Sequence, residues 1–266
     1  MIIAGYFAAL LIGVLLGMIG GGGSIITIPI LVYLFRLPPT EATGYSLFVV
    51  GMSCLAGAYK YFRLGQIRVF TGFYFGIPSI LTVLLARQYI LPAIPEIIYS
   101  THHFILTRST LLMLVFAIVM IVAAIGMLRN TVPEVSITDE KRPPVLKIIW
   151  RGIEVGLLTG LLGAGGGFII LPVLIFSFQL PMKDAVGTSL LIIAMNTLSG
   201  FAGDIFHGQQ YNWQLLLSIT ALSIVGTFAG RKFGEAFSGN QLKIYFGWFL
   251  FLVGIIIILF ELYRSL

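Results

Sequence analysis

Charge is scarce in this chain, and its absence excludes the commonest class of protein. Charged residues make up 10% of the 266 residues, whereas soluble domains carry roughly 25%. So few charges cannot cover a surface that faces water, so a soluble globular fold is excluded. Cys54 is the only cysteine, which excludes a disulfide within the chain, and we expect it to be buried. No Lys or Arg precedes Arg36, so the first segment lacks the basic region of a secretory signal and is expected to be a retained membrane helix.

Long apolar runs take the place of the missing charge. Hydrophobic residues reach 58% of the chain, and its mean hydropathy is +1.03. Runs such as Leu111–Leu128 and Ile244–Leu262 are long enough to cross ~30 Å of hydrocarbon at ~1.5 Å per residue. They are continuously apolar and do not alternate with polar residues, which favours helices over a barrel. The sequence therefore predicts an all-α polytopic membrane protein.

The chain contains an internal duplication. When Gly13–Gln66 is aligned with Gly156–Gln209 at a constant offset of 143, 21 of the 54 pairs are identical. Glycine, proline and serine keep their phase over this length, which chance similarity between apolar helices would not produce. We predict a first transmembrane repeat over residues 1–129, a linker over 130–147 and a second repeat over 148–266. Each repeat has five hydrophobic pieces: 2–19, 24–36, 43–63, 69–90 and 108–129, then 148–162, 167–178, 187–206, 212–231 and 243–263.

The basic residues predict how the repeats are oriented. If the chain reverses at the glycine runs after residues 19 and 162, 12 of the 16 Lys and Arg residues fall on one side and 4 on the other. If the glycines only kink a single span, the division becomes 9 against 7. The first arrangement obeys the positive-inside rule better, and it accounts for the net charge of +6 without a nucleic-acid partner. It places both termini outside and the 130–147 linker in the cytoplasm. Five passes per repeat then make the second repeat an inverted copy of the first, with a glycine-broken helical hairpin in each half.

The glycine runs are candidate anion-binding elements. A glycine turn followed by a helix start offers unpaired N–H groups and the positive end of a helix dipole. Such broken helices in inverted halves are typical of transporter sites near the membrane midplane. The alternative is close helix packing through small residues. The candidate substrate-binding residues here are Gly20, Gly21, Gly22, Gly23, Ser24, Thr27, Gly163, Gly165, Gly166 and Gly167.

The third piece of each repeat adds polar side chains in phase. Ser46 matches Ser189, and Ser53 matches Asn196. On a helix, residues seven apart share a face, so each pair can line a shared cavity. The alternative is simple hydrogen bonding to a neighbouring helix. The third-piece candidates are Ser46, Ser53, Thr188, Ser189 and Asn196.

The doubled pattern resembles the TauE/SafE sulfite exporter family. The resemblance rests on Gly20–Pro29 and Gly163–Pro172, each followed by Leu-Pro and then Ala-x-Gly-x-Ser, which ends at Ser46 and Ser189. It covers nearly the whole chain. It implies a permease of the bacterial plasma membrane for sulfur-containing anions such as sulfite or organosulfonates, with proton coupling as one expectation.

Other functions are less well supported by the residues. A metal or cation permease would need several carboxylates or histidines at the midplane, and the chain offers almost none. Enzyme motifs, paired carboxylates within a span and nucleotide-binding motifs are not found, so no enzyme, cofactor or metal site is expected. An anion channel stays open as an alternative to a carrier. The expected partners are a small anion and the lipid bilayer, and the oligomeric state is left open.

Overall fold

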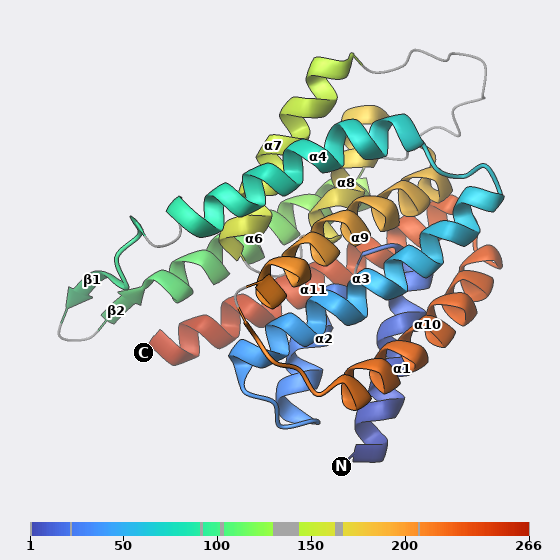
Figure 1. Cartoon of the computed structure of the whole chain (residues 1–266). Helices are drawn as coiled ribbons and strands as arrows, with labels where there is room; N and C mark the ends of the chain where they lie inside the picture. The colour runs from blue at the N-terminus through green and yellow to red at the C-terminus, as the bar shows by residue number, and fades with distance from the viewer. Residues whose placement is uncertain are drawn as a thin grey trace.

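The computed structural model describes residues 2–21, 23–90, 93–101, 104–129, 144–162, 167–206 and 208–265. In the first half the elements are α1 (Ile2–Ile19), α2 (Gly23–Tyr33), α3 (Pro39–Arg63), α4 (Val69–Leu85), a π-helical continuation η1 (Ala86–Ile90), strands β1 (Ile97–Thr101) and β2 (Phe104–Thr107), and α6 (Arg108–Arg129). In the second half they are α7 (Val145–Leu162), α8 (Gly167–Phe178), α9 (Met182–Phe206), α10 (Trp213–Glu235) and α11 (Gly239–Ser265) (Figure 1).

The prediction of an all-α polytopic membrane fold is confirmed. Each of the ten predicted pieces corresponds to a helix, with ends that differ by a few residues. Six of the described helical segments are long and apolar enough to cross a membrane: Glu41–Arg63, Val69–Ile90, Thr110–Arg129, Met182–Phe206, Trp213–Glu235 and Gly239–Glu261. The apolar helices Ala4–Ile19 and Gly167–Phe178 are shorter.

A small β-hairpin was not predicted from the sequence. Strands β1 and β2 pair antiparallel, from Ile97 opposite Thr107 to Thr101 opposite Phe104, with a bulge near Tyr99. The hairpin projects from one end of the helical body, just before α6 begins (Figure 1). It is a local addition to the helical fold.

Two pairs of parallel helices pack backbone against backbone through glycine. On α1, a Cβ atom added to Gly13 or Gly17 would lie 2.7 or 2.8 Å from the carbonyl carbon of Ser223 or Thr227 on α10. On α7, a Cβ atom at Gly152 or Gly156 would lie 2.5 Å from the carbonyl oxygen of Phe75 or Ser79 on α4. The contacts advance in the same direction along both helices, so α1 is parallel to α10 and α7 to α4. Small residues four apart allow this close approach, as in other membrane helix pairs.

The remaining long helices pair antiparallel. Gly51 of α3 approaches Leu198 of α9, and Gly57, further along α3, approaches Leu190, which is earlier in α9. In the same way α6 and α11 run in opposite directions, because Gly247 contacts Leu128 while Gly254 contacts Ile121. The short helix α8 is enclosed by this framework, and nine of its twelve residues are buried.

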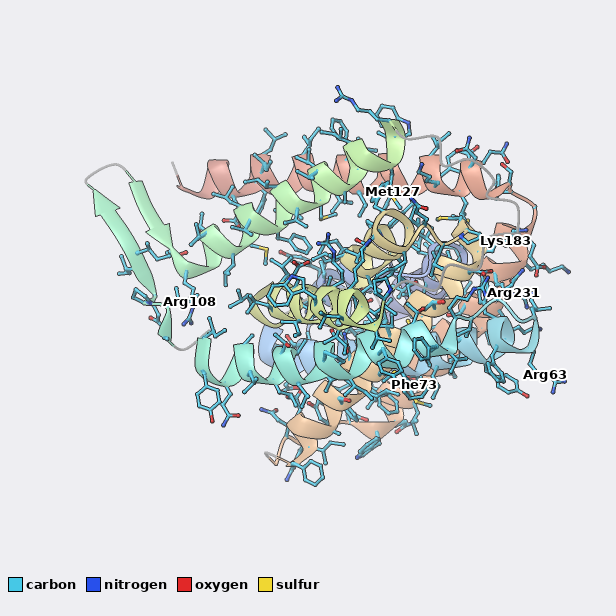
Figure 2. All side chains as sticks on the ribbon, turned by 90° about the horizontal axis from the view of Figure 1, so that it is seen from above. Arg63, Phe73, Arg108, Met127, Lys183 and Arg231 are labelled. Atoms are coloured by element: carbon cyan, nitrogen blue, oxygen red, sulfur yellow. The ribbon has the colours of Figure 1, made fainter. Side chains whose placement is uncertain are left out.

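Basic side chains gather at one end of the helices. Arg63, Lys183 and Arg231 lie at that end, and Arg108 lies at the opposite end beside the β-hairpin (Figure 2). Because α1 is parallel to α10, its first residues lie at the end opposite Arg231. The antiparallel pairing with α6 places the last turns of α11 beside the start of α6, near Arg108. Helix α7 begins at the basic end, because it is parallel to α4.

Candidate substrate site

The first glycine run turns the chain from α1 into α2. The N–H of Gly20 donates to the carbonyl of Leu16 at 2.8 Å, and Gly20 then takes a φ of +79°, which favours glycine. The hydroxyl of Ser189 on α9 donates to the carbonyl oxygen of Gly20 at 3.0 Å. A Cβ atom at Gly20 would lie 2.8 Å from that same hydroxyl oxygen. The third helix of the second half therefore holds the glycine turn of the first half.

The beginnings of α2 and α8 meet inside the protein. A Cβ atom at Gly21 would lie 2.7 Å from the carbonyl carbon of Gly167 and even closer to its oxygen. A Cβ atom at Gly167 would lie 3.2 Å from the hydroxyl oxygen of Ser24. The side chain of Ile193 on α9 lies against both glycines. Five of the predicted site residues are thus brought together: Gly20, Gly21, Ser24, Gly167 and Ser189.

The hydroxyl groups of α2 donate to backbone carbonyls at or just before the start of the helix. Ser24 Oγ donates to the carbonyl of Gly21 at 2.8 Å, and Thr27 Oγ1 donates to the carbonyl of Gly23 at 2.9 Å. Both side chains are buried. Gly23 packs against α1, since a Cβ atom there would lie 2.7 Å from the carbonyl oxygen of Ile12. To donate to an anion, each hydroxyl would have to rotate away from its present acceptor.

Two buried hydrogen bonds join α3 and α9 to helices of the opposite half. Ser53 donates to Ser223 of α10 at 2.8 Å, and the Asn196 amide donates to Ser79 of α4 at 2.9 Å. Sequence reasoning missed Ser79 and Ser223. Ser79 of the first repeat corresponds to Ser223 of the second at an offset of 144, because the second repeat has one extra residue after Gln209. The signal could have been found by continuing the alignment past Gln66 with a gap of one residue.

Asn196 has polar capacity that the described protein does not use. Its side chain is buried, with 6% exposed, and its Oδ1 has no hydrogen-bond partner in the described part of the chain. The same holds for the hydroxyl of Thr159, which lies in the last turn of α7 before the second glycine run. A buried amide can exchange its donor and acceptor ends by rotating, because Ser79 can either accept or donate. Asn196 can therefore present either an oxygen or an N–H₂ group.

At the basic end, the loop between α3 and α4 is fastened to the start of α9. The backbone N–H of Arg68 donates to Thr188 Oγ1 at 3.0 Å, and its Nε forms a salt bridge with Asp184 at 3.1 Å. The Gln66 carbonyl and the Tyr61 side chain press against Gly187. Thr188 therefore contacts this loop, whereas the adjacent Ser189 contacts the first glycine turn at Gly20. We call the contacts of Arg68 with Thr188 and Asp184 the basic-end latch.

A corresponding set of contacts lies at the other end. There the N–H of Asn212 donates to the Tyr45 hydroxyl at 2.7 Å, and the ring of Tyr211 presses against Gly44. Burial, followed by the charge of Asp204 and a hydrogen bond to it, raises the pKa of Tyr211 to about 12. We call the contacts of Tyr211 and Asn212 with Gly44, Tyr45 and Asp204 the far-end latch. It joins the α9–α10 loop to α3, just as the basic-end latch joins the α3–α4 loop to α9.

The remaining candidates are placed in part. Ser46 is buried in α3. Gly22, Gly163, Gly165 and Gly166 lie outside the described residues, so the second glycine run is seen only through Gly167. Within the described ranges, no three His, Cys, Asp or Glu side chains lie close enough together to hold a metal ion.

Comparison with known proteins identifies the family. The family model described as sulfite exporter TauE/SafE matches residues 6–257. A probable membrane transporter protein of Xylella fastidiosa is 27% identical over 261 residues, which cover 93% of this chain and 91% of the relative. A probable membrane transporter protein of Bacillus subtilis is 26% identical over 223 residues, 84% of this chain and 86% of the relative. One of Methanocaldococcus jannaschii is 25% identical over 263 residues, with coverage of 94% and 92%.

No solved structure matches the chain. The family match covers nearly all of the sequence. The relatives named as probable membrane transporters match this chain over most of their own length. The chain therefore belongs to the sulfite exporter TauE/SafE family, and it is a multi-pass membrane transporter.

Proposed function

We propose that this protein is a secondary transporter that moves a small sulfur-containing anion, sulfite or an organosulfonate, across the bacterial plasma membrane. The anion binds beside the point where the first turns of α2 and α8 meet, next to Gly21 and Gly167. The observation that carries this proposal is the contact between these two helix beginnings deep in the protein. The sulfur chemistry and the coupling to protons are supported by membership of the family.

Electrostatics favours an anion at this place. The start of each helix carries about half a positive charge from its dipole, and its first N–H groups have no partner within the helix. A fixed Lys or Arg at the midplane would cost ~2.5–3.5 kcal/mol or more. Two converging helix starts attract an anion without burying a net charge. They also hold it weakly enough to release it, as a carrier must.

The proposal includes an inverted repeat of residues 1–129 and 148–266, and several features support it. The equivalent helices α3 and α9 run antiparallel, as do α6 and α11, which a two-fold axis in the membrane plane requires. Backbone turns recur at the offset of 143: φ is +56° at Arg36 and +53° at Gln179, and +70° at Gly65 and +81° at Gly208. The bonds of Ser53 and Asn196 to the opposite half are equivalent under the same operation.

The two latches then suggest how access alternates. We propose that the basic end, which contains Arg63, Lys183 and Arg231, faces the cytoplasm, with the 130–147 linker on the same side and both termini outside. Opening the basic-end latch would connect the site to the cytoplasm, and opening the far-end latch would connect it to the outside. Because the latches are related by the repeat, the two states have similar contacts and comparable energies.

Transport by purified protein in liposomes tests this function. Vesicles loaded with unlabelled sulfite should accumulate external radiolabelled sulfite by counterflow, which a channel does not support. Taurine, sulfate and Zn²⁺ serve as competitors that represent an organosulfonate, a fully oxidised anion and a metal cation. A pH gradient should raise sulfite uptake if protons are coupled to it. Absence of counterflow, with flux that only follows the sulfite gradient, would favour a channel. Transport of Zn²⁺ but not of sulfite would overturn the proposal.

A further inference from the structure

An apolar groove opens along the side of the helical body between α4 and α10, with α3 between them. Its volume is about 580 Å³. The lining is almost wholly hydrocarbon and aromatic, with Met52, Ala56, Tyr59 and Phe62 on α3, Phe73 on α4 and Phe228 on α10. All three helices are long and apolar enough to cross the membrane. The groove therefore faces the hydrocarbon of the bilayer.

The groove has the length of one leaflet. Met52 and Phe62 are ten residues apart on α3, which corresponds to about 15 Å at ~1.5 Å per residue. The hydrocarbon core of a bilayer is about 30 Å thick, so half of it is about 15 Å. On α3 the lining ends at Phe62, next to Arg63 of the basic end, and Ile67 and Val69 close the groove there (Figure 2). Its dimensions fit a single acyl chain that hangs from the surface at the basic end.

Cations surround the end of the groove. The Lys60 ammonium lies 5.5 Å from the centre of the Phe228 ring, which itself lines the groove. Arg63 follows in the last turn of α3, and Lys232 lies one helical turn beyond Phe228. All three are exposed. In the described part of the chain, none of them forms a salt bridge, in contrast to the nearby pairs Arg68–Asp184 and Arg231–Glu235.

We propose that this groove is a binding site for one anionic phospholipid of the leaflet at the basic end. One acyl chain lies along Ala56 and Phe73, and the phosphate group lies between Lys60, Arg63 and Lys232. The apolar groove without the cations would be enough to bind a zwitterionic lipid through its acyl chains. Unpaired basic residues at the end of a groove between membrane helices add recognition of a negative headgroup. This site is separate from the anion site at Gly21 and Gly167.

Native mass spectrometry of the full chain tests the proposal. The probes are dioleoyl phosphatidylglycerol and dioleoyl phosphatidylcholine, which have identical chains but different headgroup charge. The wild-type protein should retain one phosphatidylglycerol under conditions that remove phosphatidylcholine. Lys60→Gln and Arg63→Gln should each lower the preference about fivefold, the equivalent of about 1 kcal/mol per cation. Lys147→Gln changes an exposed cation on α7 and is the matched control, which should leave the preference unchanged.

A second pair of variants tests the groove itself. Ala56→Trp fills the groove and should lower the binding of both lipids, and Ala56→Leu is a milder variant in case the first does not fold. Val122→Trp adds the same ring on an exposed face of α6 and should leave lipid binding unchanged. Equal retention of the two lipids by the wild type would overturn the proposal, and so would full retention in folded Ala56→Trp. If Ala56→Trp instead converts a dimer into a monomer, the groove is a protein interface and the proposal is wrong.

Discussion

The contact between Gly21 and Gly167 provides the sharpest perturbation of the proposed site. In Gly21→Ala, the new Cβ atom would lie 2.7 Å from the Gly167 carbonyl carbon, whereas ordinary van der Waals contact begins at 3.4 Å. The difference, 3.4 minus 2.7, requires the two helix beginnings to separate by at least 0.7 Å. Positive φ occurs at Gly20 and not at Gly21, so alanine adds bulk without backbone strain. The variant therefore tests spacing alone.

Two quantities should change together. Overpacking of a well-filled interior typically costs about 1–3 kcal/mol, so we expect Gly21→Ala to lower the unfolding temperature. An N–H···O distance near 2.9 Å that lengthens by 0.7 Å or more is no longer a hydrogen bond. Loss of one such bond to a charged group costs about 1.5–3 kcal/mol, so the affinity for sulfite should fall about tenfold or more.

Calorimetric titration of sulfite and initial uptake rates in liposomes measure these effects. Gly203→Ala is the control, because a Cβ atom there meets nothing within 4 Å, and it should bind and transport like the wild type. If Gly21→Ala unfolds at a lower temperature but binds sulfite with unchanged affinity, the glycines only serve packing. That result would refute the proposed anion site.

Three further predictions follow from the site. Asn196→Ser replaces the amide by a shorter hydroxyl, so sulfite binding should weaken about tenfold. Unchanged affinity by calorimetry would show that the amide is only structural. Arg68→Gln removes the salt bridge to Asp184 and should loosen the basic-end latch. A cysteine introduced near this latch should then react faster with a membrane-impermeant maleimide added on the cytoplasmic side, and an unchanged rate would contradict the role of the latch. Tyr211 should ionise near pH 12, not 10, because burial, and then Asp204, favour its neutral form. Its contribution to stability is thus complete below pH 10 and is lost as the pH rises towards 12. Ultraviolet difference titration against Tyr211→Phe should show this late transition, and a Tyr211 transition near pH 10 would contradict the burial of Tyr211 beside Asp204.

Much of the fold could be predicted because membrane helices are read from simple signals. Apolar runs mark the helices, and glycine and proline mark their ends, as at the turn after Ile19 and at Pro38 before α3. The β-hairpin at Ile97–Thr107 carries no comparable signal, because its strands are short, mix polar with apolar residues and lie next to a membrane helix. Which helices pack against one another was also not predicted. The parallel packing of α1 on α10 depends on which glycines face one another across the two halves, and spacing within one helix does not specify this.

The candidate site was likewise predicted only in part. Ser24 and Gly167 lie close together and are matched positions of the duplication, as expected if a two-fold axis relates the two halves and passes near them. The partners Ser79 and Ser223 were missed because one inserted residue shifts the offset from 143 to 144. Thr188 shares a helix with Ser189, but as an adjacent residue it points in another direction and contacts the α3–α4 loop. Ser24 and Thr27 donate to carbonyls at or just before the start of α2, and this choice of acceptor depends on side-chain rotamers, which the sequence does not determine.

The position of the bound anion tests the central proposal most directly. Selenite has the shape and charge of sulfite, and selenium scatters anomalously, so a crystal of the protein with ordinary methionine and added selenite would reveal the ion. Competition with sulfite for uptake would first establish that selenite is a substrate. We expect one anomalous peak beside Gly21 and Gly167, within hydrogen-bond distance of the first N–H groups of α2 or α8, and a weaker peak there in Gly21→Ala at the same selenite concentration. A selenite ion bound anywhere else, in protein that transports it, would contradict the account.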